Sequence, residues 1–263
     1  MNVVLLAAGL GTRLSPLTDI LPKCMMPIHD KPLLLYWLKI LDNEYIDEII
    51  VNTHYLSDVV TKFLSNSIFD KYKITIDYEP SLLMTGGTVL KHKSMYKNDG
   101  LLVAHADNLT SFDIKDFIHA HINKPSSCVM TMMTFVTDEP ENCGVVKINN
   151  DGIVTSFYEK VSNPPTKLAN GAVYIIDSEV MDFMNSLNKD IIDFSTEVLP
   201  YFIGRIFTYE NIDIHIDIGT CKRYKKSLES YKYSVPEDYV DWDFLTGKKN
   251  FLKYFQNKTI DTC

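Results

Sequence analysis

Short apolar runs alternate with amphipathic segments along the first half of the chain. The apolar runs are of strand length and end at glycine or polar residues, and they predict β-strands at Asn2–Ala8, Glu48–Asn52, Lys73–Tyr78 and Gly100–Ala106. The segments between them carry apolar side chains at helical spacing, and they predict helices at Lys31–Asp42, Leu56–Ser65, Gly86–Met95 and Phe112–Ile122. This alternation predicts an α/β fold with a mostly parallel sheet and helices on both of its faces.

The pattern changes after residue 125, where strand-like segments follow one another. Asn-Asp-Gly at 150–152 separates the runs Gly144–Asn149 and Ile153–Glu159, which predicts a hairpin. Further strands are expected at Ser127–Val136, Ala172–Ile176, Phe207–Tyr209 and Ile212–Ile218, and helices at Ser178–Leu187, Ser195–Phe202 and Cys221–Tyr231. The second half therefore adds a mixed sheet to the first.

These patterns predict a main domain over residues 1–232, made of a first half, 1–125, and a second half, 126–232. Residues 233–263 mix aromatic and charged side chains and predict a helical tail, which is a candidate contact in a homo-oligomer. A chain of 263 residues is long enough for one large domain with such an appendage.

Composition narrows the classes of partner. The net charge of −8 argues against binding to nucleic acid or to anionic lipid, and no apolar run is long enough to span a bilayer. The N-terminal residues do not have the pattern of a secretory signal. Five cysteines stand far apart without a C-x-x-C pair, so we expect reduced thiols, a cytoplasmic protein, and neither a zinc site nor a disulfide framework.

The segment after the first strand has the features of an anion-binding loop. Gly9 and Gly11 follow the strand directly, and glycine lets backbone N–H groups approach and face a phosphate. Arg13 and Lys23 then supply a guanidinium fork and a compact ammonium. Leu14 stands where the dinucleotide fingerprint G-x-G-x-x-G requires glycine, which opposes a dehydrogenase. The plainer alternative is a surface loop with incidental cations.

Two carboxylates follow strands that lie far apart in the sequence. Asp107 comes just after the run Gly100–Ala106, and Asp217 lies on the polar face of the alternating segment Ile212–Ile218. If both reach the same edge of one sheet, they form an oxygen site suited to Mg²⁺, which takes one or two carboxylates and completes its shell with phosphates and water. The alternative is structural: Asp107 caps the next segment and Asp217 begins a turn. His215, on the same face as Asp217, is interpreted as a structural histidine.

The run G-L-G-T-R-L-S-P-L-T-D-I-L-P-K at Gly9–Lys23 closely resembles the signature of the sugar-1-phosphate nucleotidyltransferases. The resemblance extends from Asn2 to Leu228 and continues at Gly144–Val145, Phe157–Lys160, Asn170–Gly171 and Asp217–Thr220. It implies a Rossmann-like fold of the nucleotide-diphospho-sugar transferase type. It also implies transfer of a nucleoside monophosphate from a nucleoside triphosphate to a sugar 1-phosphate, with release of pyrophosphate.

The resemblance also implies a role for each part of the site. Mg²⁺ is assigned to Asp107 and Asp217, and stabilisation of the reacting phosphates to Arg13 and Lys23. The nucleotide contacts are assigned to Ala8, Gly9, Gly11, Thr12, Glu79, Gly86 and Gly87. The acceptor contacts are assigned to Asn108, Gly144, Glu159, Lys160 and Asn170. Because a sugar phosphate is already ionised near neutral pH, positioning and charge stabilisation are the expected means of catalysis.

The segment Tyr78–Lys91 corresponds to the family's base-recognition segment and departs from it at Met84, where members commonly have glycine. An ionised Glu79 only accepts hydrogen bonds and guanine presents two adjacent donors, so GTP is favoured over CTP, dTTP and UTP. Two alternatives stay open: a phosphorylated acceptor that is not a sugar, and a catalytically silent nucleotide-binding regulatory protein. The silent protein predicts loss of Arg13, Lys23 or a metal aspartate, and none is lost.

Overall fold

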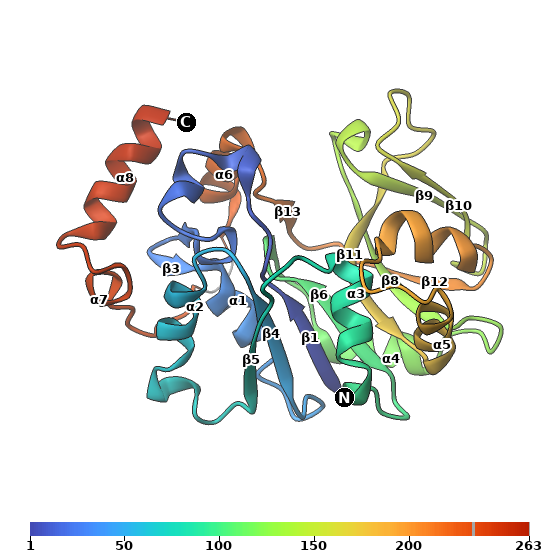
Figure 1. Cartoon of the computed structure of the whole chain (residues 1–263). Helices are drawn as coiled ribbons and strands as arrows, with labels where there is room; N and C mark the ends of the chain where they lie inside the picture. The colour runs from blue at the N-terminus through green and yellow to red at the C-terminus, as the bar shows by residue number, and fades with distance from the viewer. Residues whose placement is uncertain (233–234, 263) are drawn as a thin grey trace.

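The computed structural model describes residues 1–232 and 235–262, which form an α/β fold around one large sheet (Figure 1). Tyr233 and Ser234 of the predicted tail, and Cys263, lie outside the described residues. The α/β class predicted from the sequence is confirmed. The division into a main domain over 1–232 and a tail stays a prediction.

Four parallel strands form one side of the sheet, with β5 at its edge. They are β1 (Asn2–Leu6), β4 (Ile49–Thr53), β5 (Ile74–Tyr78) and β6 (Leu101–His105), in the order β6-β1-β4-β5. The chain leaves β1 for β4 on one side and later returns to pair β6 with β1 on the other side. The strand order therefore reverses between β1 and β6, and open α/β sheets bind ligands beyond the carboxyl ends of the strands at such a point.

The second half extends this sheet with antiparallel and parallel pairs. β11 (Leu168–Ile176) runs antiparallel to β6 and to β8 (Met130–Val136). β8 pairs in parallel with β12 (Ile206–Glu210). The predicted hairpin joins β9 (Gly144–Ile148) to β10 (Val154–Glu159). The nine strands that this sheet has in the described chain make it the mixed sheet that the sequence predicts.

Helices cover both faces of the sheet, as predicted. One face carries α1 (Leu33–Ile40), α2 (Ser57–Leu64) and α4 (Ile114–Ile122). The other face carries α3 (Met84–Lys91) and α5 (Ser178–Ser186). Val3 and Leu5 of β1 belong to the first buried cluster and Val4 to the second. Because both of their faces are buried, β1, β4 and β6 appear in the sequence as nearly continuous apolar runs.

A separate two-stranded sheet lies beside the main one. β7 (Asn108–Thr110) and β13 (His215–Asp217) pair antiparallel, with Asp217 opposite Asn108. The predicted strand over Ile212–Ile218 is therefore wrong in length, because its partner strand offers only three residues and Ile212 is 88% exposed. This small sheet, and not the edge of the main sheet, brings Asp217 beside the end of β6.

The connections contain single turns of tighter helix. The 3₁₀ turns are η1 (Thr12–Leu14), η2 (Leu17–Asp19), η3 (Lys23–Met25), η4 (Ser67–Phe69), η5 (Lys93–Met95) and η6 (Pro140–Asn142), and a short ladder pairs β2 (Pro27–Ile28) with β3 (Lys31–Pro32). The segment predicted as a helix over Ser195–Phe202 consists of a π-helical turn, η7 (Phe194–Val198), and a 3₁₀ turn, η8 (Leu199–Phe202). Pro200 has no N–H for a continuous α-helical ladder, which accounts for the change of helix type.

The segments that follow α6 (Cys221–Ser230) pack against their own chain. α7 (Trp242–Thr246) and α8 (Phe251–Thr262) form an outer layer beside α2 and the first loops (Figure 1). Trp242 Nε1 donates to Asp30 O (2.9 Å), and Phe251 and Phe255 are buried in the cluster on the α1 face. A homo-oligomer contact through the tail stays a prediction.

The cysteines depart from the prediction at one position. Cys24, Cys128 and Cys143 carry free thiols, whereas Cys221 is disulfide-bonded. The expectation of reduced thiols is wrong for Cys221, because spacing along the sequence does not show which residues folding brings within bonding distance. In residues 1–232 and 235–262, no helix combines the length and the apolar character needed to cross a membrane.

Candidate active site

The predicted anion-binding loop follows β1 and places its glycines where the backbone turns. Gly11 has a φ of +64°, and a β carbon there would lie 2.8 Å from Cγ2 of Thr18, so glycine is required. The Thr18 hydroxyl donates to Gly11 O (3.0 Å) and fixes this turn. The space beside Gly9 is open, since no atom lies within 4 Å of a β carbon built there. Ala8 and Gly9 line the main cavity, and Thr12 begins the turn η1.

Lys23 lies between the two predicted metal carboxylates. Its Nζ is 2.7 Å from Asp107 Oδ2 and 2.6 Å from Asp217 Oδ1. Burial alone would lower the pKa of Lys23, but the two carboxylates raise it above its ordinary value. Burial alone would raise the pKa of Asp107, but Lys23 and His105 hold it below its ordinary value. The structure thus brings Asp107 and Asp217 together, as an oxygen site requires, and places Lys23 between them; their roles in binding a metal and phosphates stay predictions. Lys23 and Asp107 are both charged at neutral pH.

Two arginines contact the other oxygen of Asp217. Arg13 Nη2 is 3.8 Å from Asp217 Oδ2, with its side chain 63% exposed. Arg223 Nη1 is 3.3 Å from the same oxygen, and its guanidinium also binds Glu139. Arg13 therefore points toward the predicted centre and is free to adjust when a ligand binds. Sequence analysis did not identify Arg223 and Glu139, which stand 84 residues apart and match no motif.

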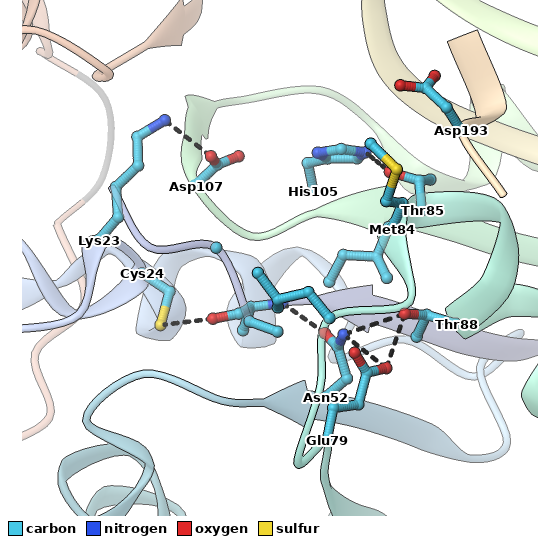
Figure 2. Close-up of a pocket in the computed structure, with 15 residues that line it drawn as sticks. Lys23, Cys24, Asn52, Glu79, Met84, Thr85, Thr88, His105, Asp107 and Asp193 are labelled. Carbon is cyan, nitrogen blue, oxygen red and sulfur yellow. Dashed lines mark hydrogen bonds and ion pairs between the residues drawn. The ribbon is translucent and has the colours of Figure 1, made fainter. Parts of the chain in front are cut away.

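A cavity of about 230 Å³ opens at the carboxyl ends of β1 and β6 (Figure 2). Ala8, Gly9, Lys23 and Asp107 line the part next to the loop. A cluster of polar side chains, Asn52, Glu79 and Thr88, lines another part of the same cavity. The cavity therefore joins a glycine-rich region that carries the Lys23–Asp107 ion pair to a hydrogen-bonding region, a combination that suits a nucleotide.

Glu79 is a buried carboxylate that is held at one oxygen. Its residue exposure is 1%, so the alternative that it faces solvent is wrong. Oε1 accepts from Asn52 Nδ2 (3.2 Å) and from Thr88 Oγ1 (2.7 Å). Asn52 is itself fixed, because its Oδ1 accepts from the Ala7 N–H (2.7 Å). Among the described residues Glu79 has no ion pair, so its second oxygen is the one left to meet a ligand that donates hydrogen bonds.

Gly86 and Gly87 lie in α3, where they face the chain before η7. A β carbon on Gly86 would lie 2.6 Å from Ile192 Cγ2, and one on Gly87 would lie 2.0 Å from Asp190 O. The Gly86 N–H also donates to Ile192 O (2.9 Å). These glycines thus let two backbones approach and hold the segment that carries Asp193 to the cavity. A direct contact of Gly86 or Gly87 with the base stays a prediction.

His105 is a cavity residue that sequence analysis did not identify. It ends β6, two residues before Asp107, and Figure 2 shows it between Asp107 on one side and Thr85 and Asp193 on the other. One ring nitrogen, Nε2, is 3.3 Å from Thr85 Oγ1. Burial lowers the pKa of His105, so the ring is neutral near pH 7. Its place at the end of a buried strand was the available signal.

The predicted acceptor residues form a second group on β9, β10 and β11. Gly144 faces Glu159, and a β carbon on Gly144 would lie 2.6 Å from Glu159 Oε2. Lys160 Nζ pairs with Glu159 Oε1 at 3.0 Å, and its side chain is largely exposed. Asn170 donates to the Tyr174 hydroxyl (2.7 Å) and accepts from the Ala172 N–H (3.0 Å), so its amide is already engaged. Contact of these residues with a sugar stays a prediction.

Asn108 connects the acceptor group to the carboxylate pair. It begins β7 next to Asp107 and lies opposite Asp217 in the small sheet. Its backbone carbonyl accepts from Trp37 Nε1 (2.9 Å), which fixes β7 against α1.

The two carboxylates fit a divalent cation that binds together with its substrate. Their oxygens lie within 2.7 Å of one shared atom, Lys23 Nζ, so they are close enough to share a ligand. In the part of the chain that the structure describes, no group of three or more His, Cys, Asp or Glu residues is arranged to hold a metal. A site with two carboxylates suits Mg²⁺, which takes its other ligands from phosphates and water.

The chain combines an α/β fold, a cavity at the carboxyl ends of β1 and β6, and a lysine held between two carboxylates. A family model described as nucleotidyl transferase matches residues 2–233, and the chain belongs to that family. The resemblance seen in the sequence is thereby confirmed.

Relatives support the same class. The chain is 29% identical to a D-glycero-alpha-D-manno-heptose 1-phosphate guanylyltransferase of Campylobacter jejuni, over 91% of this chain and 97% of that protein. It is 25% identical to a UTP–glucose-1-phosphate uridylyltransferase of Synechocystis, over 87% of this chain and 62% of that protein. The crystal structure of HddC from Yersinia pseudotuberculosis complexed with GMP-PN superposes with a TM-score of 0.73 at 26% identity, over 88% of this chain and 99% of that one.

Proposed function

We propose that the protein transfers a nucleoside monophosphate from a nucleoside triphosphate to a sugar 1-phosphate and releases pyrophosphate. The main support for this proposal is that Lys23 lies between Asp107 and Asp217, beside a glycine-rich loop. The chain also belongs to the nucleotidyl transferase family. The two relatives named above act, by their names, on a heptose 1-phosphate and on glucose 1-phosphate, which supports a sugar 1-phosphate as acceptor.

The proposed reaction is a displacement at the α-phosphorus. An oxygen of the acceptor phosphate forms a bond to the α-phosphorus, and the bond from that atom to the oxygen bridging to the β-phosphorus breaks, with the electron pair leaving on pyrophosphate. The acceptor needs no base, because the second pKa of a phosphate monoester lies near ~6. The amides of Gly9–Thr12 and Arg13 stabilise the departing pyrophosphate, and Lys23 holds the reacting phosphates together.

Asp107 and Asp217 are the residues that hold a divalent cation in this proposal. When bound, Mg²⁺ offsets phosphate charge and aligns the reacting oxygens. In the free protein, Lys23 provides the compensating charge for both carboxylates. We therefore expect the cation to bind together with the nucleotide and not to the free protein.

GTP is the proposed nucleotide. Glu79 has one oxygen fixed by Asn52 and Thr88, and its other oxygen suits the N1–H and amino donors of guanine. The guanylyltransferase relative and the HddC complex with GMP-PN support this base. UTP is the alternative nucleotide, and the uridylyltransferase relative from Synechocystis supports it.

A substrate screen tests the proposal. Each of the common nucleoside triphosphates is combined with a panel of sugar 1-phosphates and Mg²⁺, and pyrophosphate release is measured. We expect release with GTP and at least one sugar 1-phosphate, and no release when the acceptor or Mg²⁺ is left out. Release that is independent of the acceptor would contradict the proposal, because it would indicate hydrolysis.

A further inference from the structure

A second cavity, of about 130 Å³, adjoins Asp217. Asp217 Oδ1 contacts Lys23, which lines the nucleotide cavity, whereas Oδ2 contacts Arg223, which lines the second cavity. Asp217 therefore stands between the two cavities. Lys226 of α6 and Cys143 also line the second cavity.

Arg223 is held in place by two carboxylates. Its side chain is 13% exposed, its Nε and Nη2 lie 2.9 and 2.8 Å from Glu139 Oε2, and its Nη1 lies 3.3 Å from Asp217 Oδ2. A guanidinium carries five N–H donors, and these three contacts leave donors for a ligand. A buried, oriented fork of this kind suits bidentate binding of a phosphate.

The second cavity lies between the acceptor residues and Asp217. Cys143 lines it and directly precedes Gly144, which packs against Glu159. Lys160 is tied to the same place, because its N–H donates to Cys143 O (3.2 Å). In a sugar 1-phosphate, the phosphate is joined to the ring through a single oxygen. When the sugar ring binds near Gly144 and Glu159 and its phosphate points toward Asp217, the phosphate therefore enters this cavity.

We propose that Arg223 binds the phosphate of the acceptor, that Lys226 adds a second cation, and that Glu139 positions Arg223. This inference rests on the proposed function and names the receptor for the acceptor's anionic group. Lys160, to which sequence analysis assigns acceptor binding, is largely exposed and pairs with its neighbour Glu159.

Three carboxylates and two cations line the second cavity, so binding of an anion there requires that the carboxylates are compensated by other contacts. Two carboxylates besides Asp217 line it. Glu139 is compensated by Arg223 and by Lys222, and Asp138 is almost fully exposed to solvent. Arg223, whose side chain is 13% exposed, and Lys226, which is exposed, are the two cations that line this cavity, and both lie on α6.

The experiment compares Michaelis constants for the two substrates. We expect Arg223→Ala to raise KM for the sugar 1-phosphate at least about tenfold, since a charge-assisted contact is lost, and to leave KM for the triphosphate within about twofold. Arg223→Lys should fall between the wild type and Arg223→Ala, because it keeps the charge and loses the fork. Lys222→Ala is the matched control: it removes a cation from the same helix that also pairs with Glu139, but this side chain is 85% exposed and does not line the cavity.

Binding of inorganic phosphate to the whole protein, measured by calorimetry, gives a readout that does not need turnover. Weaker phosphate binding in Arg223→Ala but not in Lys222→Ala supports the proposal, and equal binding in both variants overturns it. An equal rise of both Michaelis constants in Arg223→Ala also overturns it, because Arg223 would then only support Asp217.

If Arg223→Ala does not fold in a thermal melt, Arg223→Lys and Lys226→Ala provide the same comparison. If the wild type releases no pyrophosphate with any sugar 1-phosphate, the proposed function fails, and the phosphate titration still decides the role of Arg223.

Discussion

Glu79 is a buried carboxylate whose hydrogen-bonding partners are neutral donors, Asn52 and Thr88. Glu79→Gln replaces an acceptor by an amide that also donates, which suits the edge of uracil or thymine better than that of guanine. We expect kcat/KM for GTP to fall about tenfold to hundredfold, as a lost charged hydrogen bond predicts, and the ratio of UTP to GTP use to rise. Steady-state kinetics with both nucleotides measure this. An unchanged ratio would remove Glu79 from base recognition.

Lys23 offsets the negative charge of two carboxylates, so replacing Lys23 should lower the stability of the protein as well as its activity. Lys23→Met leaves Asp107 and Asp217 facing each other, and because these carboxylates are about one-third exposed we expect a cost of about 1–3 kcal/mol. The pKa of Asp107 is lowered in the folded protein, so the stability from this contact is present above the unfolded pKa of about 3.9 and is lost as the pH falls through the folded value.

The deficit of Lys23→Met should therefore be largest near pH 7 and shrink below about pH 4, where protonation of the carboxylates relieves their repulsion. Urea unfolding of both proteins across this range measures it. A deficit that does not change with pH would show that Lys23 contributes by packing alone.

Some site residues could be identified from the sequence and others could not. Gly9, Arg13 and Lys23 lie in one contiguous run, so their residue types and the resemblance of that run to the family signature predicted a phosphate site there. Arg223 belongs to no such run, and the only sequence signal for His105 was its place at the end of a buried strand. Arg223 is identified by its contacts with Glu139 and Asp217, and the contact with Glu139 forms only when residues 84 positions apart meet in the fold.

Helix α3 contains two glycines for a reason of packing. A β carbon on Gly87 would lie 2.0 Å from Asp190 O, so Gly87→Ala should displace the segment before η7 and cost about 1–3 kcal/mol of unfolding free energy. Thermal or urea unfolding measures the cost. A variant as stable as the wild type would mean that this backbone contact yields easily.

Gly9→Ala is the matched comparison in the loop after β1. No atom lies within 4 Å of its added carbon, so stability should stay within about 0.5 kcal/mol of the wild type. The methyl group stands in the open space where a phosphate approaches, so KM for the triphosphate should rise. Loss of stability without a change in KM would contradict the assignment of this loop to the nucleotide.

The elements themselves show where sequence patterns are informative. β1, β4 and β6 are buried on both faces, so their apolar runs identified them. The segment Ile212–Ile218 alternates as a strand should, yet only His215–Asp217 pairs, because pairing needs a partner and β7 is three residues long. Alternation reports a local preference, and the length of a strand depends on distant residues.

The tail supports the folded chain as a whole. Phe255 of α8 is buried in the cluster on the α1 face, and α8 contacts η2, which belongs to the signature segment. Phe255→Ala should cost about 3–5 kcal/mol, because a large side chain is removed from a packed core. Tyr254→Ala, at the exposed neighbouring position, is the control and should cost much less. Equal effects in the two variants would show that the tail does not pack as described.

The overall architecture was accessible from the sequence because each half has a consistent pattern: strands and helices alternate before residue 125, and strands follow one another after it. The sequence did not show how the two halves are placed relative to each other. This placement depends on the pairing of β11 with β6 and on the small sheet that β7 forms with β13, and both connect residues that are distant in the sequence.

The central claim is that the nucleoside monophosphate, which contains the α-phosphate of the triphosphate, is transferred to the acceptor. Following a label on that phosphate tests the claim most directly. The protein is given GTP labelled at the α-phosphate, Mg²⁺ and a sugar 1-phosphate that releases pyrophosphate, and the products are separated by chromatography. The account predicts that the label appears in a nucleotide–sugar in amounts equal to the pyrophosphate released, and that Asp107→Asn abolishes both. Label found only in free GMP, or a nucleotide–sugar formed equally well by Asp107→Asn, would contradict it.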